Sequence, residues 1–318
     1  QAAMLRADDS YAGSETFTVY IKNMDDADGV VGVSGMINDY LTINTLTENP
    51  IALRKLCAHE YMHYTQGKYI SPDPGNIFWM EANGHLTDRL VWNEAVIPVS
   101  ESETYLLDGR KGTNSIFNFL STSWDYWDSG FWTQNIFGNV NYCYLAGTFL
   151  HYMRSYSEAE SKLDIVKLLK ETTRWSGDSW RQYLSNYITF SMNSLIGDEY
   201  DSYVKYILSG ENPNFTILNT TENPFSGLIN QTGAENDGVF VRRINYKFGN
   251  SDQEAKKDEI ELTVPYLASK VYLLYNSTPD RATFVSFKRK DDASGYQNKI
   301  YFGKYNFNLK KVEYIDIS

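Results

Sequence analysis

The chain has 318 residues, enough for one large domain or two of ordinary size, and its 42% hydrophobic and 22% charged residues are the balance of a globular protein. A formal net charge of −11 and the lack of a block of Lys and Arg argue against nucleic acid as a partner, because such a partner needs a basic surface. No run approaches the ~20 apolar residues of a membrane-spanning helix, so we expect a protein that does not span the membrane.

The beginning of the chain has the composition of a small sheet. TFTVYIK (residues 16–22) is rich in β-branched and aromatic residues, and a turn-forming cluster follows it at residues 23–29. VVGVSGMI (residues 30–37) and DYLTINTL (residues 39–46) have the pattern of two more strands. We therefore predict strands ahead of the first helix.

The pattern then changes to helical spacing. In NPIALRKLCAHEYMHYTQGKY, Asn49 can cap a helix and Pro50 suits its first position. SPDPGN (residues 71–76) breaks this helix, and residues 77–96 have the pattern of a second one. Four further helices are expected, at residues 141–156, 159–173, 179–196 and 198–210.

The composition changes again after Gly210, where the chain becomes rich in Pro, Gly and Asn. From Val239 onward the apolar runs are short and alternating, which predicts a small antiparallel β-sandwich. We expect a domain at residues 1–212, a linker at 213–235 and an all-β domain at 236–318, which together make an α+β protein.

The first helix contains the pattern His-Glu-x-x-His. His59 and His63 differ by four residues, which places them one turn apart on one helical face, where both imidazoles can bind one metal ion. Glu60 lies about 100° round the helix from His59, where its carboxylate can reach a water molecule on the same ion. Zinc prefers nitrogen and oxygen ligands of this kind. It lowers the pKa of a bound water molecule toward ~7, and a neighbouring carboxylate can then accept a proton from that water.

The pattern His-Glu-x-x-His specifies only three residues in five, so it also arises by chance on solvated helices. Its context in the chain therefore matters. It lies in an apolar helix that follows a strand-rich segment, as the motif requires. Three of the four histidines in the chain fall within 27 positions, from His59 to His85. Glu81, on the next predicted helix, supplies a third ligand after 81 − 63 = 18 positions. We therefore expect a zinc site.

The segments AHEYMHYTQGKY (residues 58–69) and WMEANGHL (residues 79–86) resemble those of the gluzincins. These are zinc metallopeptidases whose third ligand is a glutamate on a following helix. The closest likeness is to the bacterial collagenases and related peptidases with a HEYxHYxQ helix. The mucin-directed bacterial peptidases, which also have His-Glu-x-x-His-x-x-Gln, remain an alternative.

The resemblance covers roughly residues 16–153 and implies a thermolysin-like zincin core: a small sheet, an active-site helix and a helical lower half. It implies that His59, His63 and Glu81 are zinc ligands and that Glu60 is the general base. It also implies that the strand DYLTINTL is the sheet edge that binds substrate.

One departure from the family pattern affects the surroundings of the ligands. Four residues after the ligand glutamate the family carries an acid that orients a ligand histidine, and this chain has His85 there. Asp88, on the same helical face as Glu81, is a substitute. We still expect Glu81 to be the third ligand, because small Ala82 and Gly84 beside it, with Trp79 before it, let the two helices approach closely.

A peptidase also needs a donor to the oxyanion that forms at the scissile carbonyl. Tyr142, Tyr144 and His151 are the candidates, and Tyr144 is the best single choice. Cys57 lies about 200° round the helix from His59, so we expect it to be a buried apolar residue, with a Cys57–Cys143 disulfide as an alternative in an exported protein.

The sequence therefore predicts a zinc metalloendopeptidase that acts on a protein or peptide substrate, with extracellular matrix proteins and glycoproteins among the candidates. The chain begins at Gln1, and we expect that a signal segment was removed from a protein secreted by a bacterium or held on its surface. The alternative is a catalytically weak or inactive peptidase-fold surface protein that acts as a binding or adhesion module, and the His85 substitution is the feature that favours it.

Overall fold

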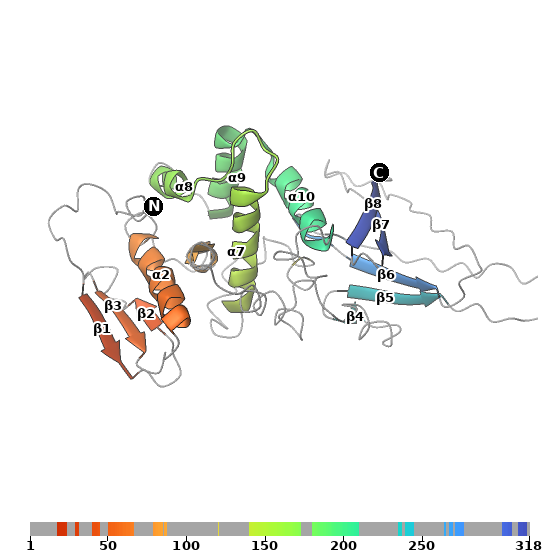
Figure 1. Cartoon of the computed structure of the whole chain (residues 1–318). Helices are drawn as coiled ribbons and strands as arrows, with labels where there is room; N and C mark the ends of the chain where they lie inside the picture. Colours follow the sequence, from red (N-terminus) through yellow and green to blue (C-terminus); the bar gives the residue numbers. More distant parts are fainter. Residues whose placement is uncertain are drawn as a thin grey trace, which may run out of the picture. The chain divides into compact units, whose positions relative to one another are not determined.

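The structure is a computed structural model of the chain (Figure 1). It describes residues 18–23, 29–31, 40–44, 50–66, 79–84, 86–87, 120, 140–172, 180–209, 235–236, 239–244, 264, 267–269, 271–276, 301–306 and 311–316. The chain forms two compact units. The first consists of residues 1–109 and 124–203, and the second of residues 110–123 and 204–318. The division into domains at 1–212 and 236–318 stays a prediction.

The first unit begins with a three-stranded sheet. Its strands are β1 (Thr18–Lys22), β2 (Gly29–Val31) and β3 (Tyr40–Asn44), in the spatial order β1-β3-β2. β3 pairs with β1 in parallel along its whole length, and with β2 antiparallel. Thr42 of β3 is buried, whereas Ile21 of β1 is 71% exposed, as suits a central and an edge strand respectively.

This strand order corrects one expectation. The strand that directly precedes the ligand helix was expected to be the edge that binds substrate, but β3 has a paired neighbour on each side. The order of strands in a sheet depends on which strands pair, and β2 returns antiparallel along β3 and covers the side that was expected to be open. Among the described strands of this sheet, β1 and β2 are the edges.

The helix α2 (Pro50–Gln66) follows the sheet and contacts β2 and β3 (Figure 1). It begins at Pro50, as the sequence predicts, because proline has a suitable φ and no N–H that needs an intrahelical partner there. The expected cap, Asn49, lies outside the described residues. All five residues from Met62 to Gln66 are buried, so the end of α2 is enclosed on every side, and its polar side chains need partners within the protein.

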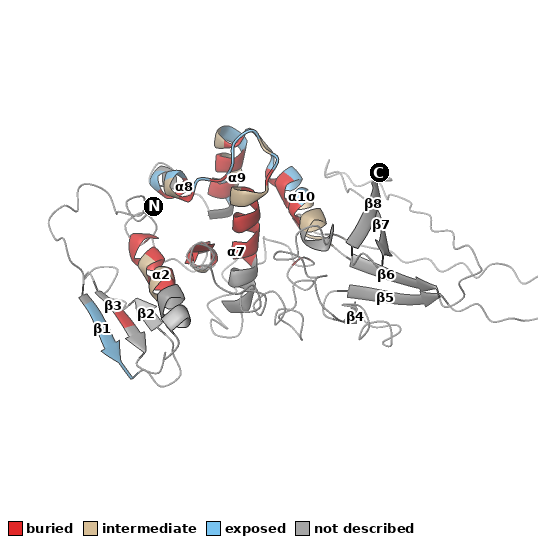
Figure 2. Ribbon diagram, in the orientation of Figure 1, coloured by how far each residue is buried: buried red, intermediate tan, exposed pale blue. Residues whose placement is uncertain are grey.

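The helical part of the first unit contains α7 (Val140–Ser155), α8 (Ile165–Thr172), α9 (Trp180–Ser191) and the first half of α10 (Ile196–Ser209), which continues into the second unit after Tyr203. Buried side chains follow the described parts of α7 and α9 (Figure 2). Phe149 of α7 packs against Tyr200 and Tyr203 of α10, with ring centroids 5.9 and 5.3 Å away. The hydroxyl groups of Thr148 and Tyr203, 2.5 Å apart, satisfy each other within this aromatic core.

Two helix boundaries differ from those predicted by more than a residue or two. α8 was expected to begin at residue 159 but begins at Ile165, because the carboxylate of Asp164 accepts hydrogen bonds from the N–H groups of Val166 and Lys167 and caps the helix there. The helix predicted for residues 179–196 ends at Ser191, because Asn193 adopts a φ of 55°, which turns the chain out of the helix before α10 begins.

The second unit contains two described sheets. One has the order β4-β5-β6, formed by β4 (Glu235–Asn236), β5 (Val239–Ile244) and β6 (Val271–Asn276), and the other pairs β7 (Tyr301–Asn306) with β8 (Lys311–Asp316) antiparallel. β5 and β6 pair in parallel, which corrects the expectation of antiparallel strands for this pair. The segment between them is long enough for a parallel crossover, which needs about a dozen residues or more. The β-sandwich itself stays a prediction.

The main chain at Leu120 belongs to the second unit, where its carbonyl oxygen accepts a hydrogen bond of 2.6 Å from the N–H of Ser269. Among the helices that the structure describes, none has the length and apolar character that crossing a membrane requires.

Candidate metal centre

Two buried histidines of α2 form one side of the site. His59 and His63 are 7% and 8% exposed, and their rings meet edge to face with centroids 4.6 Å apart. Their Nε2 atoms lie 2.9 Å from each other. The four-residue spacing therefore directs the same ring nitrogen of both histidines to one point beside α2.

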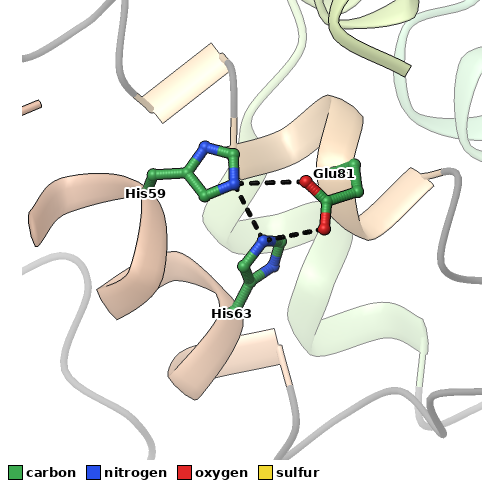
Figure 3. Close-up of side chains that lie close together, drawn as sticks. All are labelled: His59, His63 and Glu81. Carbon is green, nitrogen blue, oxygen red and sulfur yellow. Dashed lines mark hydrogen bonds and ion pairs between the residues drawn. The ribbon is translucent and has the colours of Figure 1, made fainter. Parts of the chain in front are cut away.

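Glu81 reaches that point from the helical residues 79–84 (Figure 3). Its Oε2 lies 3.2 Å from Nε2 of His59, and its Oε1 lies 3.3 Å from Nε2 of His63. One carboxylate thus faces both rings. Within the described residues, His59, His63 and Glu81 are the one group of histidine, cysteine and acidic side chains whose donor atoms come together closely enough to hold a metal ion.

Small and buried residues bring the segment of Glu81 against α2. A β-carbon placed on Gly84 would lie 2.7 Å from Cε1 and 2.9 Å from Nε2 of His59, closer than real β-carbons come to other atoms. Trp79 and Ala82 are buried in the same segment. The sequence predicted a close approach of the two helical segments from Trp79, Ala82 and Gly84. That approach is present at Gly84, where the main chain lies against the ring of His59.

The spacing of the donor atoms suits a small cation. Four ligands at the zinc–nitrogen distance of about 2.0–2.1 Å in tetrahedral geometry lie about 3.3 Å from one another. The two nitrogen–oxygen distances in the cluster are 3.2 and 3.3 Å, and the nitrogen–nitrogen distance is 2.9 Å. A separation of the rings by about 0.4 Å would give all three the tetrahedral spacing and leave a fourth position for water.

Electrostatics keep Glu81 ionised. Burial by itself raises the pKa of this carboxyl group, but the positive charge that His63 can carry and the hydrogen bonds from His59 and His63 outweigh burial and lower the pKa well below its ordinary value. A ligand must be deprotonated before it binds a metal ion, so Glu81 does not compete with protons for that role near neutral pH.

Gln66 belongs to this site although the sequence analysis gave it no role. Its side chain is fully buried at the end of α2. Its Oε1 lies 2.9 Å from Nδ1 of His63, and its Nε2 donates a hydrogen bond of 3.1 Å to the carbonyl oxygen of Met80. The available signal was its position three residues after His63, which puts both side chains on one helical face.

Glu60 and Cys57 lie on α2 close to His59 in the sequence. Glu60 is 6% exposed, so a carboxylate lies buried in the turn between the two histidines. Burial and, to a lesser extent, the negative charge of Glu60 raise the pKa of the Cys57 thiol. Cys57 is a free, half-buried cysteine, and the raised pKa keeps it a thiol rather than the thiolate that binds metals.

The remaining predicted site residues fall mostly outside the described residues. His85 and Asp88 lie there, and so does the side chain of Tyr144, although its backbone belongs to α7. His151 is buried on the same helix, with its ring against Tyr156 at a centroid distance of 5.8 Å.

Comparison of the chain with protein-family models, with curated proteins and with solved structures found no match. The likeness to the gluzincins therefore rests on the two segments at residues 58–69 and 79–86. These same segments contribute the three side chains that converge in Figure 3.

Proposed function

We propose that the chain is a zinc-dependent endopeptidase of the gluzincin type, with His59, His63 and Glu81 as zinc ligands and Glu60 as general base. One observation carries the proposal: two buried imidazole nitrogens and an ionised carboxylate, contributed by a His-Glu-x-x-His helix and the next helical segment, meet at one point.

The two glutamates have separate tasks in this proposal. A zinc ion at the site would supply a Lewis acid and a water molecule of lowered pKa. Glu81 has the lowered pKa of a weak base, which suits a ligand rather than a proton carrier. Glu60 lies in the turn between the two histidines, where it accepts the proton of the attacking water and passes it to the leaving amine.

An extended peptide is the substrate class that the sheet suits. Edge strands offer unpaired N–H and C=O groups, to which a peptide can add as another strand. Of the two described edges, β2 is the one against which α2 packs more extensively, so it is the edge that we associate with the proposed ligand helix. We therefore assign substrate pairing to β2 in place of β3, and the net charge of −11 agrees with a protein rather than a nucleic acid substrate.

Hydrolysis with and without a chelator tests the proposal. The full chain should cleave casein or members of a quenched peptide library, lose this activity in a chelator and regain it when zinc is added. A contaminating protease is excluded if His63→Ala, purified in the same way, is inactive. A zinc-loaded chain that cleaves nothing would support the alternative of a surface binding module.

A further inference from the structure

Gln66 occupies a position from which it controls one ligand. Its side chain is fully buried, and it lies three residues after His63 on α2. The amide group contacts Nδ1 of His63 at one end and the carbonyl oxygen of Met80 at the other. It thus connects a predicted ligand to the residue that directly precedes Glu81.

The contact with Met80 fixes which way the amide points. A main-chain carbonyl oxygen can only accept hydrogen bonds, so the atom that Gln66 places 3.1 Å from it must be the NH₂ nitrogen. The amide oxygen is then necessarily the atom 2.9 Å from Nδ1 of His63. The usual ambiguity between the two ends of a glutamine amide does not arise at this site.

The orientation of the amide in turn fixes the tautomer of His63. An amide oxygen can only accept, so Nδ1 of His63 must carry the proton that it donates to Gln66. Nε2 is then the ring nitrogen left for a metal ion, which takes the place of any proton that Nε2 donates to Glu81 in the metal-free chain. Nε2 lies 2.9 Å from Nε2 of His59 and 3.3 Å from Oε1 of Glu81.

We propose that Gln66 is a positioning residue of the metal centre: it holds His63 in the tautomer whose Nε2 can bind the metal, and it ties α2 to the segment that carries Glu81. The inference deepens the proposed zinc site and rests on it for its functional meaning. The tautomer, however, is a property of the metal-free chain and can be measured without zinc.

Three variants distinguish a role of Gln66 in fixing the His63 tautomer from a role in packing alone. Gln66→Met keeps a long side chain but removes both hydrogen bonds. Gln66→Glu keeps an acceptor for Nδ1 of His63 and loses the donor to Met80. Thr65→Val is the matched control, because Thr65 is equally buried one residue earlier and its hydroxyl donates to Tyr61 O within α2.

Nitrogen NMR of the ring nitrogens in the metal-free full chain reports the tautomer directly, and only four histidines contribute signals. His63 should carry a proton on Nδ1 in the wild type, in Gln66→Glu and in Thr65→Val, because each of them keeps an acceptor facing that nitrogen. It should lose this preference in Gln66→Met. A wild-type His63 with its proton on Nε2 would overturn the inference even if Gln66→Met failed to fold.

Zinc affinity, measured by competition with a chelator, supplies the second readout. Removing an outer partner of a ligand typically costs about 10–100-fold in affinity, so we expect that loss for Gln66→Met, a smaller one for Gln66→Glu and none for Thr65→Val. Equal losses in both Gln66 variants would leave only a packing role and contradict the inference. A wild type that binds no zinc but holds the Nδ1–H tautomer would instead refute the zinc site while the assignment of the tautomer stands.

Discussion

The main chain of Gly84 lies against the imidazole ring of His59, so that a β-carbon at Gly84 would come within 2.7 Å of the ring carbon Cε1. The absence of a side chain at Gly84 therefore allows the segment that carries Glu81 to approach α2. The requirement is steric rather than conformational, because Gly84 lies within a helical turn that any residue can adopt.

Gly84→Ala should weaken zinc binding by about 10–100-fold, the loss typical of changes in the outer-shell support of a ligand, because the Gly84 main chain supports the ring of His59. The added methyl group must push the His59 ring or the segment of Glu81 aside. Gly197→Ala is the matched control, because a β-carbon at that position on α10 meets nothing within 4 Å. Chelator competition on both variants measures the effect, and equal zinc affinities would show that the contact has no bearing on the site.

Glu81→Ala should remove zinc at concentrations at which His85→Ala still retains it. The carboxylate of Glu81 faces both His59 and His63, with oxygen–nitrogen distances of 3.2 and 3.3 Å. Removal of a ligand costs more affinity than removal of its support, which typically costs about 10–100-fold. Equilibrium dialysis against a series of zinc concentrations ranks the two variants, and the reverse order would make His85 the third ligand.

The lowered pKa of Glu81 predicts how acid affects the metal-free chain. A carboxyl group whose pKa is lower in the folded than in the unfolded state stabilises the fold fully above its unfolded value, here 4.5, and less as the pH falls through the folded value. The unfolding temperature of the wild type should therefore fall more steeply below about pH 4.5 than that of Glu81→Gln. Parallel curves for the two proteins would mean that Glu81 is not stabilised as an anion by His59 and His63.

Glu60→Gln should keep the metal and lose the reaction. The substitution removes a buried proton acceptor of nearly the same shape and leaves His59, His63 and Glu81 unchanged. General-base catalysis contributes about 10²–10⁴-fold, so peptide turnover should fall by at least about 100-fold. Turnover close to that of the wild type, at equal zinc content, would show that Glu60 is not the general base.

Local signals in the sequence were sufficient to predict the helix α2 and to identify His59, His63 and Glu81 as residues that come together. Pro50 marked where the helix begins, and the four-residue spacing of His59 and His63 placed both rings on one face. Glu81 followed from its distance along the chain and from the small residues beside it. The helix start and the shared face of His59 and His63 depend on helix geometry, which a short stretch of sequence specifies by itself, whereas Glu81 was found from its spacing to His63.

The features that depend on contacts between distant segments were not predictable in the same way. The central place of β3 depends on which strands pair, and neither partner is apparent from the strand itself. Gln66 acquires its role only because the carbonyl of Met80 lies within reach of its amide, which requires the two helical segments to be packed together. The start of α8 was missed because Asp164 caps it, although the residues before it also suit a helix.

The zinc content of the purified full chain tests the central claim most directly. Elemental analysis after dialysis against dilute zinc should find about one zinc per chain in the wild type, because two imidazoles and a carboxylate are the ligand set of open catalytic zinc sites. His59→Ala and His63→Ala, treated identically, should hold little or none. A wild type that carries no transition metal even after zinc is added would contradict the account.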